Sequence, residues 1–318
     1  MTKPEARITR EARSSNDEFP NDECPIDDLV RLLVPELPEV ETMRRGLLCL
    51  EGRRIASVNQ PPCQCRPIAL TPRMAEFRRR AVGQRIESIE RRGKRVLLVL
   101  AGGDAIVFEP RMTGVVLVGR PPDRDYLRFE LTVSGRGPKR LLFWDRRGLG
   151  SVKLLRPREI ETQLGAHQLG PDAMAVTAAA LREQFANSRR AIKVALLDQR
   201  SLAGIGNLYA SEILHVAGVH PERPCARLAA DEWRRVHAAM RRVLKRAIAM
   251  EGSTLSDGTY RTALNNAGSY QNCHRVYDRR GDTCPTCCIG TVERIVQGQR
   301  STFFCPICQP GNGRSRSR

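Results

Sequence analysis

Four cysteines near the C-terminus have the spacing of a metal site. Two residues separate Cys284 from Cys287, two separate Cys305 from Cys308, and 17 residues lie between the pairs. Two thiolates on each tight turn, brought together by a hairpin, form the tetrahedral sulfur cage that Zn2+ prefers in proteins. Four thiolates leave no open position for a substrate, so we expect one structural zinc ion. A register that uses the adjacent Cys288 is the alternative.

The net charge points to a polyanionic partner. Lysine and arginine number 53 against 35 acidic residues, which gives a formal charge of +18 and a pI of about 10.1. Basic side chains bind phosphates with release of condensed counterions, so such an excess suits nucleic acid. Charge alone does not separate DNA from the ribosome or an acidic membrane surface. An arginine on the hairpin between the cysteine pairs, such as Arg294 or Arg300, could grip a phosphate bidentately, although a solvated arginine is the simpler interpretation.

Membrane and secretory classes are disfavoured by the sequence. No apolar run approaches the roughly 20 residues that a membrane span needs. Residues 1–33 lack the apolar stretch of a secretory signal. We therefore expect a cytoplasmic protein, in which the 11 cysteines are thiols or metal ligands rather than disulfides.

The elements that must position these residues change in character along the chain, which predicts a multi-domain α+β fold. Apolar residues at helical spacing predict a helix over 39–50. Short β-rich runs between turn residues predict a β-sandwich over 55–155. Beyond residue 170 the pattern becomes helical, near 177–187, 190–198, 207–217 and 230–251. The expected regions are a disordered extension (1–34), a β-sandwich domain with flanking helices (35–157), a helical domain (170–265), a zinc ribbon (270–309) and a disordered basic tail (310–318).

Four stretches, in order, resemble the formamidopyrimidine-DNA glycosylase family (Fpg, or MutM). They are PELPEVET at 35–42, RRGK at 91–94, AGIGNLYASE at 203–212, and the ribbon that ends Cys308-Gln309. The resemblance covers 35–309 and implies that the helical domain is a helix-two-turns-helix DNA-binding domain. It also implies a bifunctional DNA glycosylase and apurinic-site lyase of base excision repair. Such an enzyme flips an oxidised purine (8-oxoguanine or a formamidopyrimidine) out of damaged duplex DNA, excises it and nicks the strand by β,δ-elimination.

The resemblance also implies four catalytic residues. Pro35 matches the family's N-terminal proline, whose α-amine has a pKa of about 8, roughly two units below that of lysine, so it can attack at neutral pH. Its secondary amine forms a cationic Schiff base with the opened sugar, which promotes β-elimination. Glu36 would act as general acid on the sugar ring oxygen. Lys94 would assist base loss and β-elimination. Arg300 would contact a phosphate and assist δ-elimination. Without the resemblance, Glu36 and Lys94 would be an ordinary helix-start carboxylate and a surface lysine.

Further residues match the family's DNA contacts. Met112 and Arg147 match residues that fill the gap left by the flipped base and hold its orphaned partner, and Leu149 stands where phenylalanine is usual. An apolar leucine can still unstack a base step. The other implied DNA contacts are Arg124, Arg189, Lys193 and Asn207. Taken alone, Met112 would be a sheet core residue and Asn207 a helix N-cap. Glu212 resembles the family's helix carboxylate near the nucleophile.

The numbering conflicts with this chemistry, because an internal proline nitrogen is an amide without a nucleophilic lone pair. Val34 stands where the family has its initiator methionine, and valine is what an internally translated GTG start codon becomes. Residues 1–33 hold five basic and eight acidic residues, unlike the basic remainder. We therefore expect translation to start at position 34, with Pro35 as the mature N-terminus. The alternative is a real extension, which implies proteolytic maturation or a catalytically dead DNA binder.

Three other functions remain open. Endonuclease VIII removes oxidised pyrimidines with the same amine, but usually has glycine where this chain has Leu37. A non-catalytic DNA-binding relative would keep the basic groove and ribbon. A generic zinc-ribbon protein explains neither Pro35 nor Asn207. We expect a DNA-binding monomer, associated with the bacterial nucleoid, whose lesion-recognition loop lies within 253–270.

Overall fold

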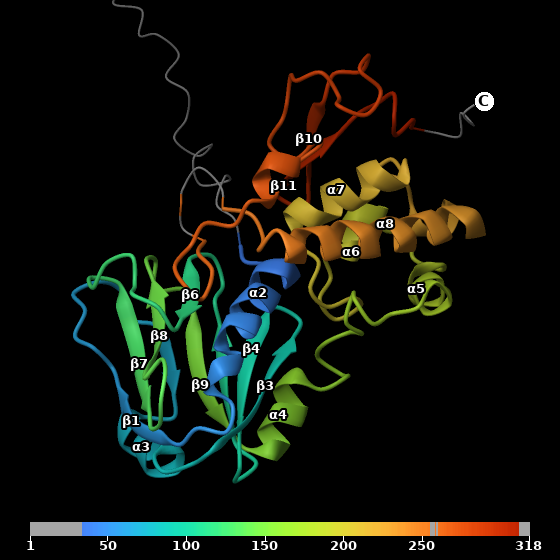
Figure 1. Cartoon of the computed structure of the whole chain (residues 1–318). Coiled ribbons are helices and arrows are strands. Elements are labelled where there is room, and N and C mark those ends of the chain that lie inside the picture. Colours follow the sequence, from blue (N-terminus) through green and yellow to red (C-terminus); the bar gives the residue numbers. More distant parts are fainter. Residues whose placement is uncertain (1–33, 255–257, 259, 312–318) are drawn as a thin grey trace, which may run out of the picture. The chain divides into compact units, whose positions relative to one another are not determined.

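Figure 1 shows the computed structural model, which describes residues 34–254, 258 and 260–311. The expected extension lies outside these residues except for Val34, and so does the expected basic tail beyond residue 311. Among the helices that the structure describes, none is long and apolar enough to cross a membrane.

The first helix that the structure describes, α2, spans Leu37–Leu47, and the PELPEVET stretch at 35–42 runs into its N-terminus. It begins two residues earlier than predicted because Glu36 and Glu39 form a capping box, in which the Glu36 N–H donates to the Glu39 carboxylate at 3.0 Å. Its apolar stripe, including Val40 and Met43, is fully buried. A 3-10 helix, η1 (Leu48–Leu50), completes the predicted segment.

Two sheets form the predicted β-sandwich. One sheet is antiparallel with the order β1-β7-β8-β6, and the other has the order β2-β9-β5-β4-β3, in which only β2 and β9 pair in parallel. The strands are β1 (Ile55–Asn59), β2 (Ala69–Thr71), β3 (Ile86–Arg92), β4 (Arg95–Leu100), β5 (Ala105–Glu109), β6 (Gly114–Leu117), β7 (Leu127–Val133), β8 (Arg140–Asp145) and β9 (Ser151–Leu155). Two short helices, α3 (Met74–Ala81) and α4 (Pro157–Leu164), were not predicted. In α3 only Phe77 and Ala81 are buried, too few for a clear apolar period.

The helical region follows the predicted pattern closely. It contains α5 (Ala178–Phe185), α6 (Ile192–Leu196), α7 (Asn207–Ala217), the 3-10 helix η2 (Cys225–Arg227) and α8 (Ala230–Ala249). Gly218, at φ +67°, ends α7 in the left-handed conformation that favours glycine. Trp233 of α8 stacks on Phe185 of α5 with ring centroids 6.0 Å apart, which fixes these two helices against each other.

The C-terminal region is the expected ribbon. After the 3-10 helix η3 (Tyr270–Cys273), β10 (Glu293–Gln297) and β11 (Arg300–Phe304) form an antiparallel hairpin between the two cysteine pairs. In Figure 1 this hairpin lies next to α7. One cluster of buried apolar residues runs from the sandwich through α7 and α8 into the ribbon. The three regions therefore share a continuous core.

Candidate active site

Glu36 is the centre of the site, held by the N-terminus of a helix far along the chain. Its carboxylate accepts hydrogen bonds from the backbone N–H of Gly206 at 2.6 Å and of Leu208 at 2.9 Å. The start of α7 therefore binds this carboxylate as helix N-termini bind anions. A Cβ on Gly206 would overlap the Glu36 carboxyl group, so only glycine permits this approach. Pro35 is buried beside it.

A second buried carboxylate, which sequence reasoning left without a role, supports this arrangement. Glu39 accepts hydrogen bonds from the Tyr209 hydroxyl at 2.6 Å and the Ser253 N–H at 2.9 Å, as well as from the Glu36 N–H. Burial raises the pKa of Glu39, while these hydrogen bonds oppose that rise. The signal in the sequence was the three-residue spacing of Glu36 and Glu39, which is that of a capping box.

Burial moves the pKa values of two side chains in the site toward neutral pH. It raises the pKa of Glu36 to about 7, against the charge of Lys94, which lowers it. Lys94 lies in the turn between β3 and β4, and its pKa is lowered by burial, with the charge of Glu36 opposing. A carboxylic acid that retains its proton near pH 7 can act as a general acid. A nearby amine of lowered pKa can act as a base.

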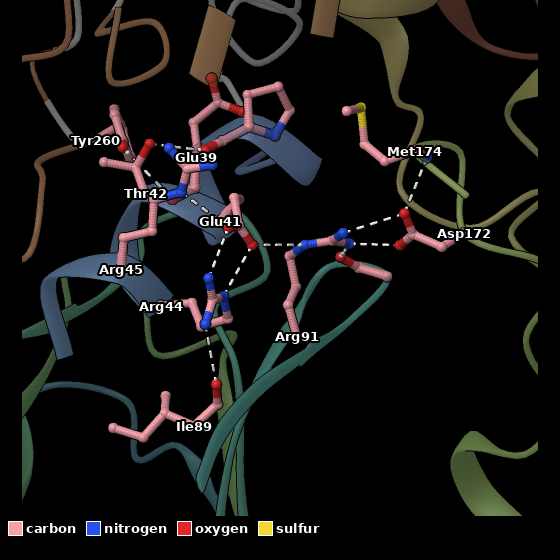
Figure 2. Close-up of polar contacts among 12 residues, drawn as sticks. Glu39, Glu41, Thr42, Arg44, Arg45, Ile89, Arg91, Asp172, Met174 and Tyr260 are labelled. Carbon is pink, nitrogen blue, oxygen red and sulfur yellow. Dashed lines mark hydrogen bonds and ion pairs between the residues drawn. The ribbon is translucent and has the colours of Figure 1, made fainter. Parts of the chain in front are cut away.

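An ion-pair network positions the turn that carries Lys94. In Figure 2 the Arg91 guanidinium lies between Glu41 of α2 and Asp172 at the start of the helical region, with N–O distances of 3.2 Å and 2.6 Å. Arg91 also donates to the carbonyl of Gly93 at 3.0 Å. The contacts join α2, the β3–β4 turn and the helical region through one side chain that is only 11% exposed.

Lys193 and Asn207 lie against the ribbon hairpin. The buried Lys193 ammonium donates to the Asn207 side chain at 2.5 Å and to the Thr302 hydroxyl at 2.8 Å. Asn207 donates to the carbonyl of Ser301 at 2.9 Å. Burial lowers the pKa of Lys193 to about 7, and the charge of Arg300 adds to this effect. Arg300 itself is exposed at the start of β11. These contacts join two of the predicted site residues, Lys193 and Asn207, to the hairpin strand that begins at Arg300.

Met112, Arg147 and Leu149 come from two turns that one carboxylate ties together. The Arg147 guanidinium donates to the Met112 sulfur at 3.4 Å. Asp145, fully buried, accepts hydrogen bonds from the Thr113 hydroxyl at 2.5 Å and from the Arg147 N–H at 3.2 Å. The structure thus brings Met112 and Arg147 together, with Leu149 half-buried in the same loop. Their contact with DNA stays a prediction.

Three implied residues remain, namely Arg124, Arg189 and Glu212. Arg124 and Arg189 are exposed on loops. The Glu212 carboxylate accepts hydrogen bonds from the backbone N–H groups of Arg275, Val276 and Tyr277 at 2.9–3.1 Å. These bonds make Glu212 an anchor between α7 and the ribbon. The proposed recognition loop lies partly outside the described residues, at 255–257 and 259.

The four expected cysteines form one cluster. The sulfurs of Cys284, Cys287, Cys305 and Cys308 all lie within 4.8 Å of one another. Backbone N–H groups donate to three of them at 3.3–3.5 Å, as in a tight metal-binding turn. Cys288 is exposed and lies outside the cluster, so the alternative register is wrong. The donor set fits a tetrahedral zinc ion, which prefers thiolates.

Comparison with known proteins places this geometry in a family. The model of the formamidopyrimidine-DNA glycosylase N-terminal domain matches residues 34–152, and that of the formamidopyrimidine-DNA glycosylase H2TH domain matches residues 169–259. Formamidopyrimidine-DNA glycosylase from Chloroflexus aurantiacus is 41% identical over 277 residues, which cover 87% of this chain and 98% of the relative.

Solved structures agree with these matches. The crystal structure of MutM (Fpg) from Thermus thermophilus aligns with a TM-score of 0.75 and 36% identity, covering 88% of this chain and all of that one. A Lactococcus lactis Fpg variant in complex with DNA that contains formamidopyrimidine deoxyguanosine aligns with a TM-score of 0.76 and 28% identity, covering 87% and 100%.

Proposed function

Because the chain belongs to the formamidopyrimidine-DNA glycosylase family, we propose that it is a DNA glycosylase of base excision repair that removes oxidised purines from duplex DNA. The observation that carries the proposal is the buried Glu36 carboxyl group, bound by the N-terminus of α7 and with a pKa raised to about 7. Leu37, where endonuclease VIII usually has glycine, favours purine over pyrimidine lesions. The DNA in the complex described above contains formamidopyrimidine deoxyguanosine.

The reaction would begin with proton donation by Glu36 to the ring oxygen of the damaged nucleotide's sugar. The amine of Pro35 would attack the sugar C1′ and expel the base. The bond from C1′ to the ring oxygen would then break, with the oxygen leaving as a hydroxyl that holds the proton from Glu36, and the opened sugar would stay bound to Pro35 as a Schiff base. Lys94, whose pKa is lowered, would assist base loss and β-elimination. Arg300, exposed on the ribbon hairpin, would bind phosphate and assist δ-elimination. The enzyme would thus also act as a DNA-(apurinic or apyrimidinic site) lyase.

This chemistry requires Pro35 at the N-terminus. The family model of the N-terminal domain begins its match at residue 34, which supports Val34 as the initiator position. Removal of the initiator would then expose the proline amine. In a chain that retains residues 1–33, the same site would bind damaged DNA without forming a Schiff base.

The DNA would be gripped by residues from all three regions. Met112, Arg147 and Leu149 would fill the gap left by the flipped base and hold its partner. The remaining contacts would come from Arg124, Arg189 and Asn207. Lys193, expected from the sequence to contact DNA, is fully buried, so it would act indirectly by orienting the Asn207 side chain at the ribbon hairpin. We expect the protein to act as a monomer in the bacterial cytoplasm, associated with the nucleoid through its DNA.

A structural zinc ion would hold the ribbon. Cys284, Cys287, Cys305 and Cys308 would bind it, and the ion would supply folding free energy rather than reactivity. By fixing the two ends of the β10–β11 hairpin, it would keep Arg300 near α7.

Borohydride trapping tests the proposal. The substrate is a duplex with 8-oxoguanine opposite cytosine, and the proteins are the 318-residue chain and one that starts at position 34. We expect a trapped protein–DNA adduct from the shorter chain alone, and its loss in a variant of that chain that retains its initiator residue, because the Pro35 nitrogen is then an amide. A duplex with thymine glycol measures the competing pyrimidine activity. Tight binding without an adduct from either chain would instead identify a non-catalytic DNA-binding relative.

A further inference from the structure

The exposed side of α8 is a stripe of basic residues. The exposed positions recur with the spacing of one helix face, at 231, 234, 235, 238, 242, 245, 246 and 249. Acidic residues occur only in the first turn of the helix, where Asp231 forms an ion pair with Arg235 at 2.5 Å. Beyond that turn, every charged residue of the stripe is an arginine or a lysine.

Three cations of this stripe have no partner in the fold. Within residues 34–254, 258 and 260–311, no group forms an ion pair or hydrogen bond with the side chains of Arg234, Arg242 or Lys245. Like charges three positions apart on a helix, as in Arg242 and Lys245, repel each other and destabilise it. A bound polyanion removes this repulsion, so the stripe favours a negatively charged ligand.

A cavity of about 780 Å³ adjoins the stripe and contains a fourth such cation. Arg242 of α8 and Arg275, which follows η3, both line it. The Arg275 guanidinium donates to the Thr286 hydroxyl at 3.1 Å and pairs with no carboxylate in the part of the chain that the structure describes. The two lining carboxylates, Asp231 and Glu232, are already paired with other arginines. The cavity therefore keeps an excess of positive charge.

This basic surface is separate from the buried carboxyl group of Glu36. The cavity is lined by His215 and Gly218 at the C-terminal end of α7, whereas Glu36 is bound at the N-terminus of the same helix. Because α7 has 11 residues, its two ends are about 16 Å apart. In Figure 1, α8 lies beside α7. DNA bound at Glu36 therefore occupies a different place from a ligand bound in the cavity.

The residue types of the stripe indicate which polyanion it fits. Its exposed residues include no aromatic or large apolar side chain. It therefore offers no surface on which single-stranded bases could stack, and no apolar anchor for a protein or a membrane. Arg234 and Lys245 are about 16 Å apart along the helix, which is the rise of about five base pairs of a duplex. This spacing suits the phosphate backbone of double-stranded DNA.

We propose that Arg234, Arg242, Lys245 and Arg275 form a second binding surface for the backbone of duplex DNA. It holds one segment of DNA while another segment occupies the lesion site. The contacts are made with phosphates and are independent of base sequence. In taking DNA as the partner, the inference rests on the proposed function.

The test measures binding of a labelled undamaged duplex to the full zinc-loaded chain after saturation with a short duplex that contains a tetrahydrofuran abasic analogue. One variant replaces the four cations of the proposed surface: Arg234→Ala, Arg242→Ala, Lys245→Ala and Arg275→Ala. A control variant loses the same charge through exposed cations outside α8, which lie on α3, α4 and the β7–β8 turn: Arg79→Ala, Arg136→Ala, Lys139→Ala and Arg158→Ala. The dissociation constant of the second duplex is measured at several salt concentrations.

We expect the wild type and the control variant to bind the second duplex with the same salt dependence. Each phosphate contact contributes about 0.9 to the slope of log K against log salt concentration, so the surface variant should lose about 3–4 from the magnitude of this slope. Its affinity for the abasic-analogue duplex should equal that of the control variant. Equal slopes in the two variants, or no second duplex bound by the wild type, would overturn the proposal. Absence of any preference for the abasic analogue would count against the proposed function, and the slopes would still decide on the second surface.

Discussion

Replacing Glu36 with glutamine removes a proton donor while keeping the size of the side chain. The two oxygens of the carboxyl group face two N–H donors, Gly206 at 2.6 Å and Leu208 at 2.9 Å. In Glu36→Gln the side-chain NH2 must face one of these donors, so one buried hydrogen bond is lost. We expect a loss of about 1–3 kcal/mol in the free energy of unfolding. Loss of general-acid catalysis should slow base excision by about 10²–10⁴-fold.

The pH dependence separates these two effects. Glu36 acts as an acid only while protonated, and its pKa is raised to about 7. The wild-type excision rate should therefore fall as pH increases through about 7. This decrease should be absent from the pH profile of Glu36→Gln. The assay is single-turnover cleavage of an 8-oxoguanine duplex by a chain starting at Pro35, with strand scission and base release measured separately. Binding to an abasic-analogue duplex serves as the control for folding.

An excision rate in Glu36→Gln within threefold of the wild type would refute the role of Glu36 as acid. The role would also be refuted if the variant is slow but its excision rate still falls through pH 7 as in the wild type, because another group would then be titrating. A variant that no longer binds the abasic-analogue duplex has lost its structure; the pH profile of the wild type then decides the question, since a flat profile across pH 7 contradicts the assignment.

Three further predictions test the supports of the site. Gly206→Ala places a Cβ against the neighbouring carboxyl group, so it should cost about 1–3 kcal/mol of unfolding free energy and slow excision, measured by urea denaturation and single-turnover cleavage. Asp172→Asn weakens the partly buried ion pair with Arg91 and should lower the free energy of unfolding by about 1–2 kcal/mol in the same denaturation assay. The control is Asp231→Asn, which removes an exposed ion pair and should change the free energy of unfolding by less than about 0.5 kcal/mol. Equal effects of the two aspartate variants would contradict the role of the network. Cys284→Ser should release the metal, expose the ribbon to proteolysis and weaken lesion binding more than tenfold, and unchanged proteolysis would show that zinc is not needed there.

Local sequence patterns predicted correctly those structural features that are determined by residues close together in the chain. The spacing of Cys284, Cys287, Cys305 and Cys308 predicted their cluster, because each pair lies on one tight turn and a hairpin joins the turns. The boundaries of α7 were predicted at Asn207 and Ala217, since Gly206 and Gly218 flank a continuous apolar helix. Short elements such as α3 and β2 were missed because they bury too few side chains to show a period.

Only the tertiary structure determined which residues meet. The sequence alone indicated a family motif at Glu36 and a glycine-rich turn at Gly206, but not that the second binds the first across 170 positions. It also left Glu39 and Arg91 without a role, because a carboxylate in a helix and an arginine in a strand are ordinary until their partners are known. The raised pKa of Glu36 follows from burial, which depends on the packing of distant segments. The sequence therefore determined the family, the four cysteines that cluster and most elements, whereas the pKa shifts of the site arise from long-range contacts that no local pattern encodes.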